Sequence, residues 1–141
     1  SAEQIRDAML AVSGELKHRD SGGPSVGGDQ PVRSLFVKRL RNTPDSVLHC
    51  FDAPAGFDSA PTRSETTTPT QALMLSNSEW PLARARAFAK RVLGGDSAVT
   101  DSHLARAYQI AWGRGPMPVE LDIAGQFFGY KTWDFKSSYF I

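Results

Sequence analysis

The fold class is indicated by residues 2–16, AEQIRDAMLAVSGEL, because their apolar side chains recur with the period of an α-helix. These side chains follow the spacing i, i+3, i+4, i+7 and i+11: Ile5, Ala8, Met9, Val12 and Leu16. Acidic residues lie in the early turns and basic residues follow the end, which suits the helix dipole. We expect the apolar stripe to be the face by which this helix packs into the core.

Five further segments carry helical signals and are separated by Gly- or Pro-containing breaks. They are residues 43–51, 68–77, 80–93, 101–112 and 118–128. Thr43 is expected to cap the first of these, and Thr68-Pro69-Thr70-Gln71 has the pattern of a capping box at the start of the second. We interpret Thr68, Gln71 and Asn77 as scaffold residues that fix a loop against a helix. In the third segment we expect Arg84 to be solvated.

Two long segments are rich in Gly, Pro and small polar residues, 20–32 and 52–67, and we expect both to be ordered loops. The short apolar stretch 34–37 is expected to be extended. The sequence therefore predicts an all-α fold, an irregular bundle of about six short-to-medium helices with long ordered Gly/Pro-rich loops. We expect a single helical domain over residues 1–126, as a fragment of a larger protein, and an atypical or truncated aromatic-rich tail over 127–141.

The 141 residues are 40% hydrophobic and 22% charged, which is typical of a globular domain. The formal net charge of +1 argues against nucleic acid as a partner, because phosphate-backbone binding usually needs a clearly basic face. No apolar run approaches the roughly 20 residues of a membrane-spanning helix, so we expect no membrane span.

Signals for a metal or a haem group are also missing from the sequence. Cys50 is the single cysteine, so no disulfide can form within the chain. The three histidines and Cys50 are scattered, without the ligand spacing of a zinc site. Since no Cys-x-x-Cys-His motif occurs, haem cannot be attached covalently to this chain. We expect no cofactor in this chain.

The densest basic cluster consists of Arg33, Lys38, Arg39 and Arg41. Guanidinium groups bind phosphate, sulfate and carboxylate through forked hydrogen bonds, so the cluster is a candidate contact for an anionic glycan or a partner domain. The alternative is that these residues pair with Asp45, Asp52 and neighbouring acids inside the domain.

Asp52 is the one carboxylate that we considered for catalysis. Glycosidase-like chemistry needs a second acid, and Glu65 or Asp58 in the same loop could supply it. The alternative is that Asp52 accepts hydrogen bonds from loop amides. The sequence contains no Gly-x-Ser-x-Gly or His-Glu-x-x-His motif.

Several motifs in order resemble a planctomycete-type domain of unknown function. They are Ile5-Arg6-Asp7-Ala8-Met9-Leu10, Gly22-Gly23-Pro24-Ser25-Val26, Arg33-Ser34-Leu35-Phe36, Phe51-Asp52-Ala53-Pro54, Arg63, Thr66-Thr67-Thr68-Pro69-Thr70-Gln71 and Ala105-Arg106-Ala107-Tyr108. The resemblance covers residues 2 to about 125. It departs at Ser59, where family members often carry Cys, and in the tail after Gln126.

The resemblance implies a place at the C-terminal end of a large exported bacterial protein, many of which also carry a cytochrome c-like module. It implies a periplasmic or cell-surface location and no agreed catalytic residues. The expected partners are other domains of the parent protein, among them a c-type haem module, and the exposed apolar surface is expected to favour self-association.

Two functions follow as hypotheses from these observations. The first is a non-catalytic structural or interaction domain of a large exported protein. The second is a part of a polysaccharide-active hydrolase or a glycan-binding surface. The candidate residues for an anion, a glycan or another domain are Arg33, Arg39, Arg41, Asp52 and Arg63.

Overall fold

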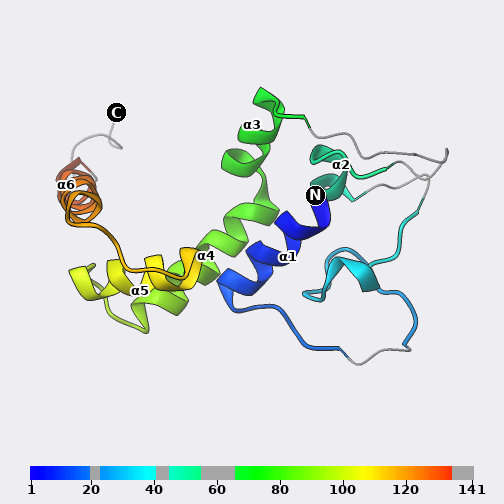
Figure 1. Ribbon diagram of the computed structural model, residues 1–141, viewed down its shortest axis with the longest axis horizontal. Helices are drawn as coiled ribbons and strands as arrows, with labels where there is room; N and C mark the ends of the chain where they lie inside the picture. Colours follow the sequence, from blue (N-terminus) through cyan, green and yellow to red (C-terminus); the bar gives the residue numbers. More distant parts are fainter. Residues whose placement is uncertain (20–22, 41–44, 55–65, 135–141) are drawn as a thin grey trace. The chain divides into compact units, whose positions relative to one another are not determined.

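The computed structural model describes residues 1–19, 23–40, 45–54 and 66–134, with side chains as far as Gly129. This part of the chain contains helices and no strand, so the predicted all-α class is confirmed (Figure 1). The elements are α1 (Ala2–Ser13), the 3-10 turn η1 (Ser34–Phe36), α2 (Ser46–Cys50), α3 (Pro69–Asn77), α4 (Glu79–Leu93), α5 (Asp101–Trp112) and α6 (Pro118–Asp134). Parts of both expected loops, 20–22 and 55–65, lie outside the described residues.

The chain divides into two compact units, residues 1–89 and residues 90–141. In the first unit, α1 has α2 and η1 as its close neighbours, and α2 also contacts α3. The buried apolar side chains of this unit come from α1, α2 and the segment between them: Ala2, Leu10, Val32, Val37, Val47 and Leu48. The core of the first unit is therefore built on α1.

The face of α1 that is buried differs from the predicted one. The buried residues are Ala2, Arg6, Leu10 and Ser13, which follow the helical spacing i, i+4, i+8 and i+11. The predicted stripe is only half-buried or exposed, with Ala8 exposed and Met9 and Val12 half-buried. The predicted face was wrong because the charged Arg6 lies on the buried side of the helix, where backbone carbonyls accept its hydrogen bonds.

Residues 34–37 were expected to be extended, and this was only partly correct. Ser34, Leu35 and Phe36 form the 3-10 turn η1, because the Asp7 carboxylate on α1 accepts hydrogen bonds from the Ser34 amide and hydroxyl, both at 2.7 Å. Val37 is extended and forms an isolated parallel bridge with Val26.

Helix α2 begins later than predicted. Its N-cap is Asp45, whose Oδ1 accepts hydrogen bonds from the backbone amides of Val47 and Leu48, both at 3.0 Å. A carboxylate at this position satisfies two amides that have no partner in the helix. Thr43, the expected cap, lies outside the described residues.

The second unit has a small interior. Its buried apolar side chains in the described part are Val92 and Leu104. Helix α5 ends at Trp112 and is followed by Gly113, whose left-handed φ of 70° terminates the helix, and α5 and α6 are close neighbours. Helix α6 runs on to Asp134, past residue 126, where the atypical tail was expected to begin, and residues 135–141 lie outside the described part.

An ion pair joins the end of α5 to the start of α6. Arg114 donates to both carboxylate oxygens of Glu120, at 2.8 and 2.7 Å, and the Met117 amide donates to the same carboxylate at 2.7 Å. The hydrogen bonds from Arg114 are the main reason that the pKa of Glu120 falls from 4.5 to about 2. The guanidinium also lies over the rings of Tyr108 and Trp112, at 5.5 and 5.9 Å from their centroids.

No helix in the described part of the chain has the length and apolar character needed to cross a membrane.

The Arg114–Glu120 pair predicts an acid-dependent loss of stability. Since the folded state lowers the pKa of Glu120, the contribution is complete above 4.5 and is lost as the pH falls toward about 2. We expect wild type to melt at a higher temperature than Glu120→Gln at neutral pH, and the difference to vanish over that interval in circular dichroism melts. As a control, Glu79→Gln removes the exposed pair with Arg86 and should change the melts little. A constant difference between wild type and Glu120→Gln down to the lowest pH would contradict the assignment.

Candidate functional site

The first unit is organised around the guanidinium of Arg6, which is fully buried at 0% exposure. Its Nη1 donates to the carbonyl of Val32 at 2.8 Å, and its Nη2 donates to the carbonyls of Gly28 and Gln30, both at 2.9 Å. Carbonyl groups of a loop segment far from α1 in sequence thus hold the charge. Burial lowers the pKa of Arg6, and the carboxylates of Asp45 and Asp7 oppose that shift.

Asp7 completes this centre from the next position of α1. Besides the two hydrogen bonds from Ser34, its carboxylate forms ion pairs of 3.7 Å with Arg6 and with Arg33. Arg6 and Asp7 together tie residues 28–34 to the first helix. This arrangement organises the backbone around the buried guanidinium.

The predicted basic cluster is engaged by acids of α1. Arg33 pairs with Asp7 at 3.7 Å, and Arg39 pairs with Glu3 at 3.3 Å. Among the described residues, neither arginine forms an ion pair with Asp52. Two further candidates, Arg41 and Arg63, lie outside the described part of the chain.

Asp52 closes the loop that separates α2 from α3. Its Oδ2 accepts hydrogen bonds from the hydroxyl and the amide of Thr66, at 2.7 and 2.8 Å. The hydroxyl bond is the main cause of a lowered pKa of Asp52. The backbone of Asp52 is left-handed, with φ of 60°, which is uncommon for a residue other than glycine. The geometry therefore shows Asp52 as an acceptor for the far end of its own loop.

Gln71 anchors the same loop from α3. The capping box is present: the Gln71 amide donates to the Thr68 hydroxyl, and the Thr68 amide donates to the Gln71 side chain. The side-chain amide of Gln71 is buried and also donates to the carbonyls of Thr66 at 3.0 Å and Cys50 at 3.2 Å. Asn77 is the exposed last residue of α3, and its side chain makes no hydrogen bond within the described residues.

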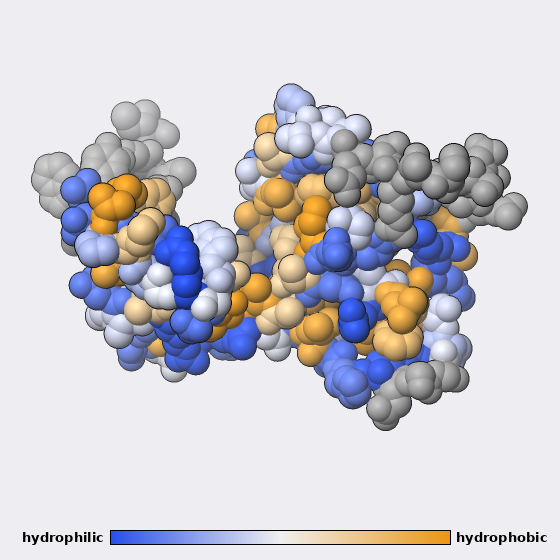
Figure 2. All heavy atoms as spheres, viewed as in Figure 1, coloured by the Kyte–Doolittle hydropathy of each residue, from blue (hydrophilic) through white to orange (hydrophobic). Residues whose placement is uncertain are grey.

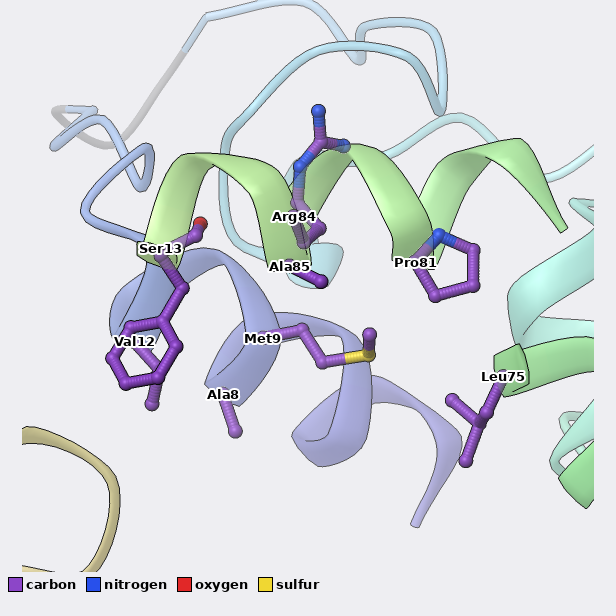
Figure 3. A pocket seen from close by; sticks show the side chains of 9 residues that line it. Ala8, Met9, Val12, Ser13, Leu75, Pro81, Arg84 and Ala85 are labelled. Carbon is purple, nitrogen blue, oxygen red and sulfur yellow. The ribbon is translucent and has the colours of Figure 1, made fainter. Parts of the chain in front are cut away.

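An open groove of about 370 Å³ runs between α1 and α4 (Figure 3). The residues that line it are mostly apolar: Ala8, Met9, Val12, Ser13, Leu75, Pro81, Arg84, Ala85 and Phe88. Figure 3 shows the guanidinium of Arg84 pointing away from Ala8 and Leu75, so the floor of the groove is formed by apolar side chains. Three of its residues belong to the apolar stripe that the sequence assigned to the core.

The spacing of α1 and α4 is set by long side chains. Arg84 binds Glu15 through two hydrogen bonds of 2.6 and 3.1 Å, and its side chain is only 18% exposed. The ring of Trp80 lies under both Arg84 and Arg6, with centroid distances of 4.9 and 5.7 Å. The expectation that Arg84 is solvated was wrong, because Glu15 and Trp80 compensate for its burial.

Sequence reasoning missed Arg6, Glu15 and Arg84 as organising residues. One signal could have found Arg6: it lies at the same helical face as Ala2 and Leu10, four residues from each. Arg84 lies between apolar residues at i−4 and i+4, Trp80 and Phe88, which is a comparable signal. In the part of the chain that the structure describes, no three His, Cys, Asp or Glu side chains are grouped to hold a metal ion.

Comparison with known proteins gives a family. Residues 1–128 match the family designated PSD1, which is described as a protein of unknown function (DUF1553). No curated protein and no solved structure matches the chain.

The Arg6 centre predicts a large cost for a charge-conserving substitution. In Arg6→Lys, a compact ammonium cannot reach three carbonyls at once, so buried acceptors lose their donors. We expect a loss of about 2–4 kcal/mol in the free energy of unfolding, measured in urea. The control Arg86→Lys, on an exposed pair, should stay within about 0.5 kcal/mol of wild type. Equal stability of the two variants would show that the carbonyl contacts contribute little.

The Gln71 node predicts a graded series on α3. Gln71→Ala should lower the free energy of unfolding by about 1–3 kcal/mol, because the part-buried carbonyls of Cys50 and Thr66 lose their donor. Thr68→Ala should cost about 1 kcal/mol as the loss of a cap. Asn77→Ala, exposed on the same helix, should change stability by less than about 0.5 kcal/mol in the same thermal or urea measurement. A larger effect at Asn77 than at Gln71 would contradict this description.

Proposed function

The chain belongs to the PSD1 family of proteins of unknown function, and on that premise we propose that it is a structural and interaction domain. In this proposal the groove between α1 and α4 receives an apolar helix or segment from another domain of the parent protein. The proposal concerns the first unit, residues 1–89.

One observation carries the proposal: one face of α1 is buried in the first unit, and another face of the same helix lines an open groove. Its inner face is buried and is held by Arg6, whereas Ala8, Met9 and Val12 line an open groove. An apolar stripe at helical spacing gains free energy when it leaves water, by about 25 cal/mol per Å². A partner with apolar side chains would complete the burial that α1 alone does not provide.

The charges at the groove support a protein partner. Arg84 is the one charged residue in the lining, and Glu15 already neutralises it through two hydrogen bonds. An apolar segment would therefore leave no guanidinium without a counter-charge when it covers the groove. Interfaces between domains typically combine an apolar centre with paired charges at the rim.

The second unit also presents apolar side chains to solvent, and Figure 2 shows hydrophobic patches on the surface of both units. Large exposed side chains of this unit are Val99, Trp112, Met117, Val119, Ile123, Phe127 and Phe128. Trp112 and Ile123 are 65% and 64% exposed. Exposed apolar surface of this kind is typical of a region that contacts other proteins.

The alternative of a hydrolase or a glycan-binding surface has weaker support. Arg33 and Arg39 are engaged by Asp7 and Glu3, and Asp52 is engaged by Thr66. Contacts within the domain therefore explain the positions of three candidate residues of that alternative, Arg33, Arg39 and Asp52, and no bound ligand is needed to explain them.

We also propose a setting for this domain. The parent protein is exported, and a c-type haem module is one of the neighbouring domains that can reach the groove. The complete gene tests this directly: a signal peptide and a Cys-x-x-Cys-His motif in the same reading frame are the expected findings.

Ala85→Arg tests the groove itself. Ala85 is exposed and lies in the groove lining, so an arginine there should obstruct the groove and leave the Arg6 centre intact. We expect it to weaken binding to separately expressed neighbouring segments of the parent polypeptide by at least about tenfold, measured by titration calorimetry. We also expect wild type to self-associate with rising concentration in sedimentation velocity, and Ala85→Arg to do so less.

The matched control is His49→Arg, which places the same side chain at an exposed position of α2 outside the groove lining. This variant should bind and sediment like wild type. If Ala85→Arg and wild type behave alike in both measurements, the groove is not the docking surface.

A further inference from the structure

The start of α5 carries a chain of hydrogen-bonded polar side chains. The hydroxyl of Thr100 lies 2.9 Å from Nδ1 of His103, and Nε2 of the same ring lies 3.2 Å from a carboxylate oxygen of Asp96. The hydroxyl of Ser102 lies 2.9 Å from that of Thr100. All four residues belong to the second unit.

The direction of the proton in this chain follows from the carboxylate. Asp96 can only accept, so the ring nitrogen facing it, Nε2, carries the hydrogen. In the neutral ring Nδ1 is then an acceptor, and the Thr100 hydroxyl donates to it. The His103 side chain is only 13% exposed, which limits the ring's freedom to turn away. A hydroxyl, an imidazole and a carboxylate thus stand in the order of a general-base relay.

Thr100 is the N-cap residue of α5, yet its hydroxyl does not cap the helix. A threonine at this position ordinarily accepts a hydrogen bond from an amide of the first turn. Here the backbone carbonyl of Thr100 binds the Leu104 amide at 3.1 Å, whereas the hydroxyl is directed to His103. In the described part of the chain, the amides of Ser102 and His103 therefore have no acceptor and are available to an oxyanion.

A pocket of about 410 Å³ is lined in part by Thr100. Most of the other lining residues are apolar or small, namely Ala98, Val99, Leu104, Gly125, Phe128 and Gly129, and two are polar, Ser97 and Asp101. The size of the pocket and the apolar part of its lining suit a short apolar acyl group.

We propose that Thr100, His103 and Asp96 form an esterolytic site for small carboxylic esters with an apolar acyl group. Thr100 is the nucleophile, His103 is the general base and acid, and Asp96 is a positioning residue that fixes the tautomer of the ring. The site adds an activity in the second unit and does not depend on the groove of the first.

The reaction proceeds in two steps, acylation of Thr100 and hydrolysis of the acyl-threonine. Thr100 Oγ1 forms a bond to the carbonyl carbon of the ester while its proton passes to Nδ1 of His103, and the tetrahedral oxyanion faces the amides of Ser102 and His103. The carbon–alkoxide bond then breaks, and the alkoxide leaves as an alcohol with the proton from His103. A water molecule repeats the sequence on the acyl-threonine, giving a carboxylic acid and restoring the Thr100 hydroxyl.

The test uses the full chain with p-nitrophenyl butyrate as substrate and a fluorophosphonate as covalent probe. We expect peptide mass spectrometry to place the phosphonyl group on Thr100. Thr100→Asn keeps an N-cap residue but removes the hydroxyl, and it should lose the label and at least about tenfold in initial rate. His103→Asn should lose rate to a similar extent, and Thr100→Ser should keep the label.

His49→Gln is the control for hydrolysis by surface imidazoles, because His49 is exposed on α2. Its rate should stay within about twofold of wild type. The proposal is overturned if Thr100→Asn, with an unchanged circular dichroism spectrum, hydrolyses at the wild-type rate. It is also overturned if the probe labels Cys50 or another residue in place of Thr100.

Discussion

The first unit depends on one constraint, that the charge of Arg6 is buried and must be surrounded by acceptors. Taking a guanidinium out of water costs several kcal/mol unless each donor finds a partner. The carbonyls of Gly28, Gln30 and Val32 are the partners of the two Nη groups, and they come from residues 22 to 26 positions away in sequence. Within the described residues, the buried Nε has no hydrogen-bond partner. The path of the chain after α1 is therefore set by the donor geometry of one side chain, and the core forms around it.

The same constraint explains which parts of the fold could be predicted from sequence. Helix existence could be predicted, because periodicity and the Thr68–Gln71 capping box are local signals that lie within a few residues. The orientation of α1 could not, because it depends on carbonyls that no sequence pattern brings next to Arg6. A period of 3.6 residues shows that a helix has an apolar face, but it does not show whether that face meets the core or a partner.

Candidate site residues show the same division between local and distant contacts. Asp52 was considered either for catalysis or as an acceptor for loop amides, and the structure places it on the amide and hydroxyl of Thr66. The acids that engage Arg33 and Arg39 lie on α1, about 26 to 36 positions away, so their identity required the fold. Arg84 and Glu15 are separated by 69 positions, and no local pattern connects them.

The use of main-chain carbonyls by Arg6 has a consequence for variation in the segment 28–32. Every residue type offers the same carbonyl oxygen, so binding of the buried guanidinium does not require a particular side chain at these positions. The exposed Asp29 and Gln30 can therefore vary, or be redesigned for a new surface, as long as the backbone keeps its path. Val32 and Gly28 are constrained for other reasons, because Val32 is buried in the core and a side chain at Gly28 would meet the Asp45 carboxylate.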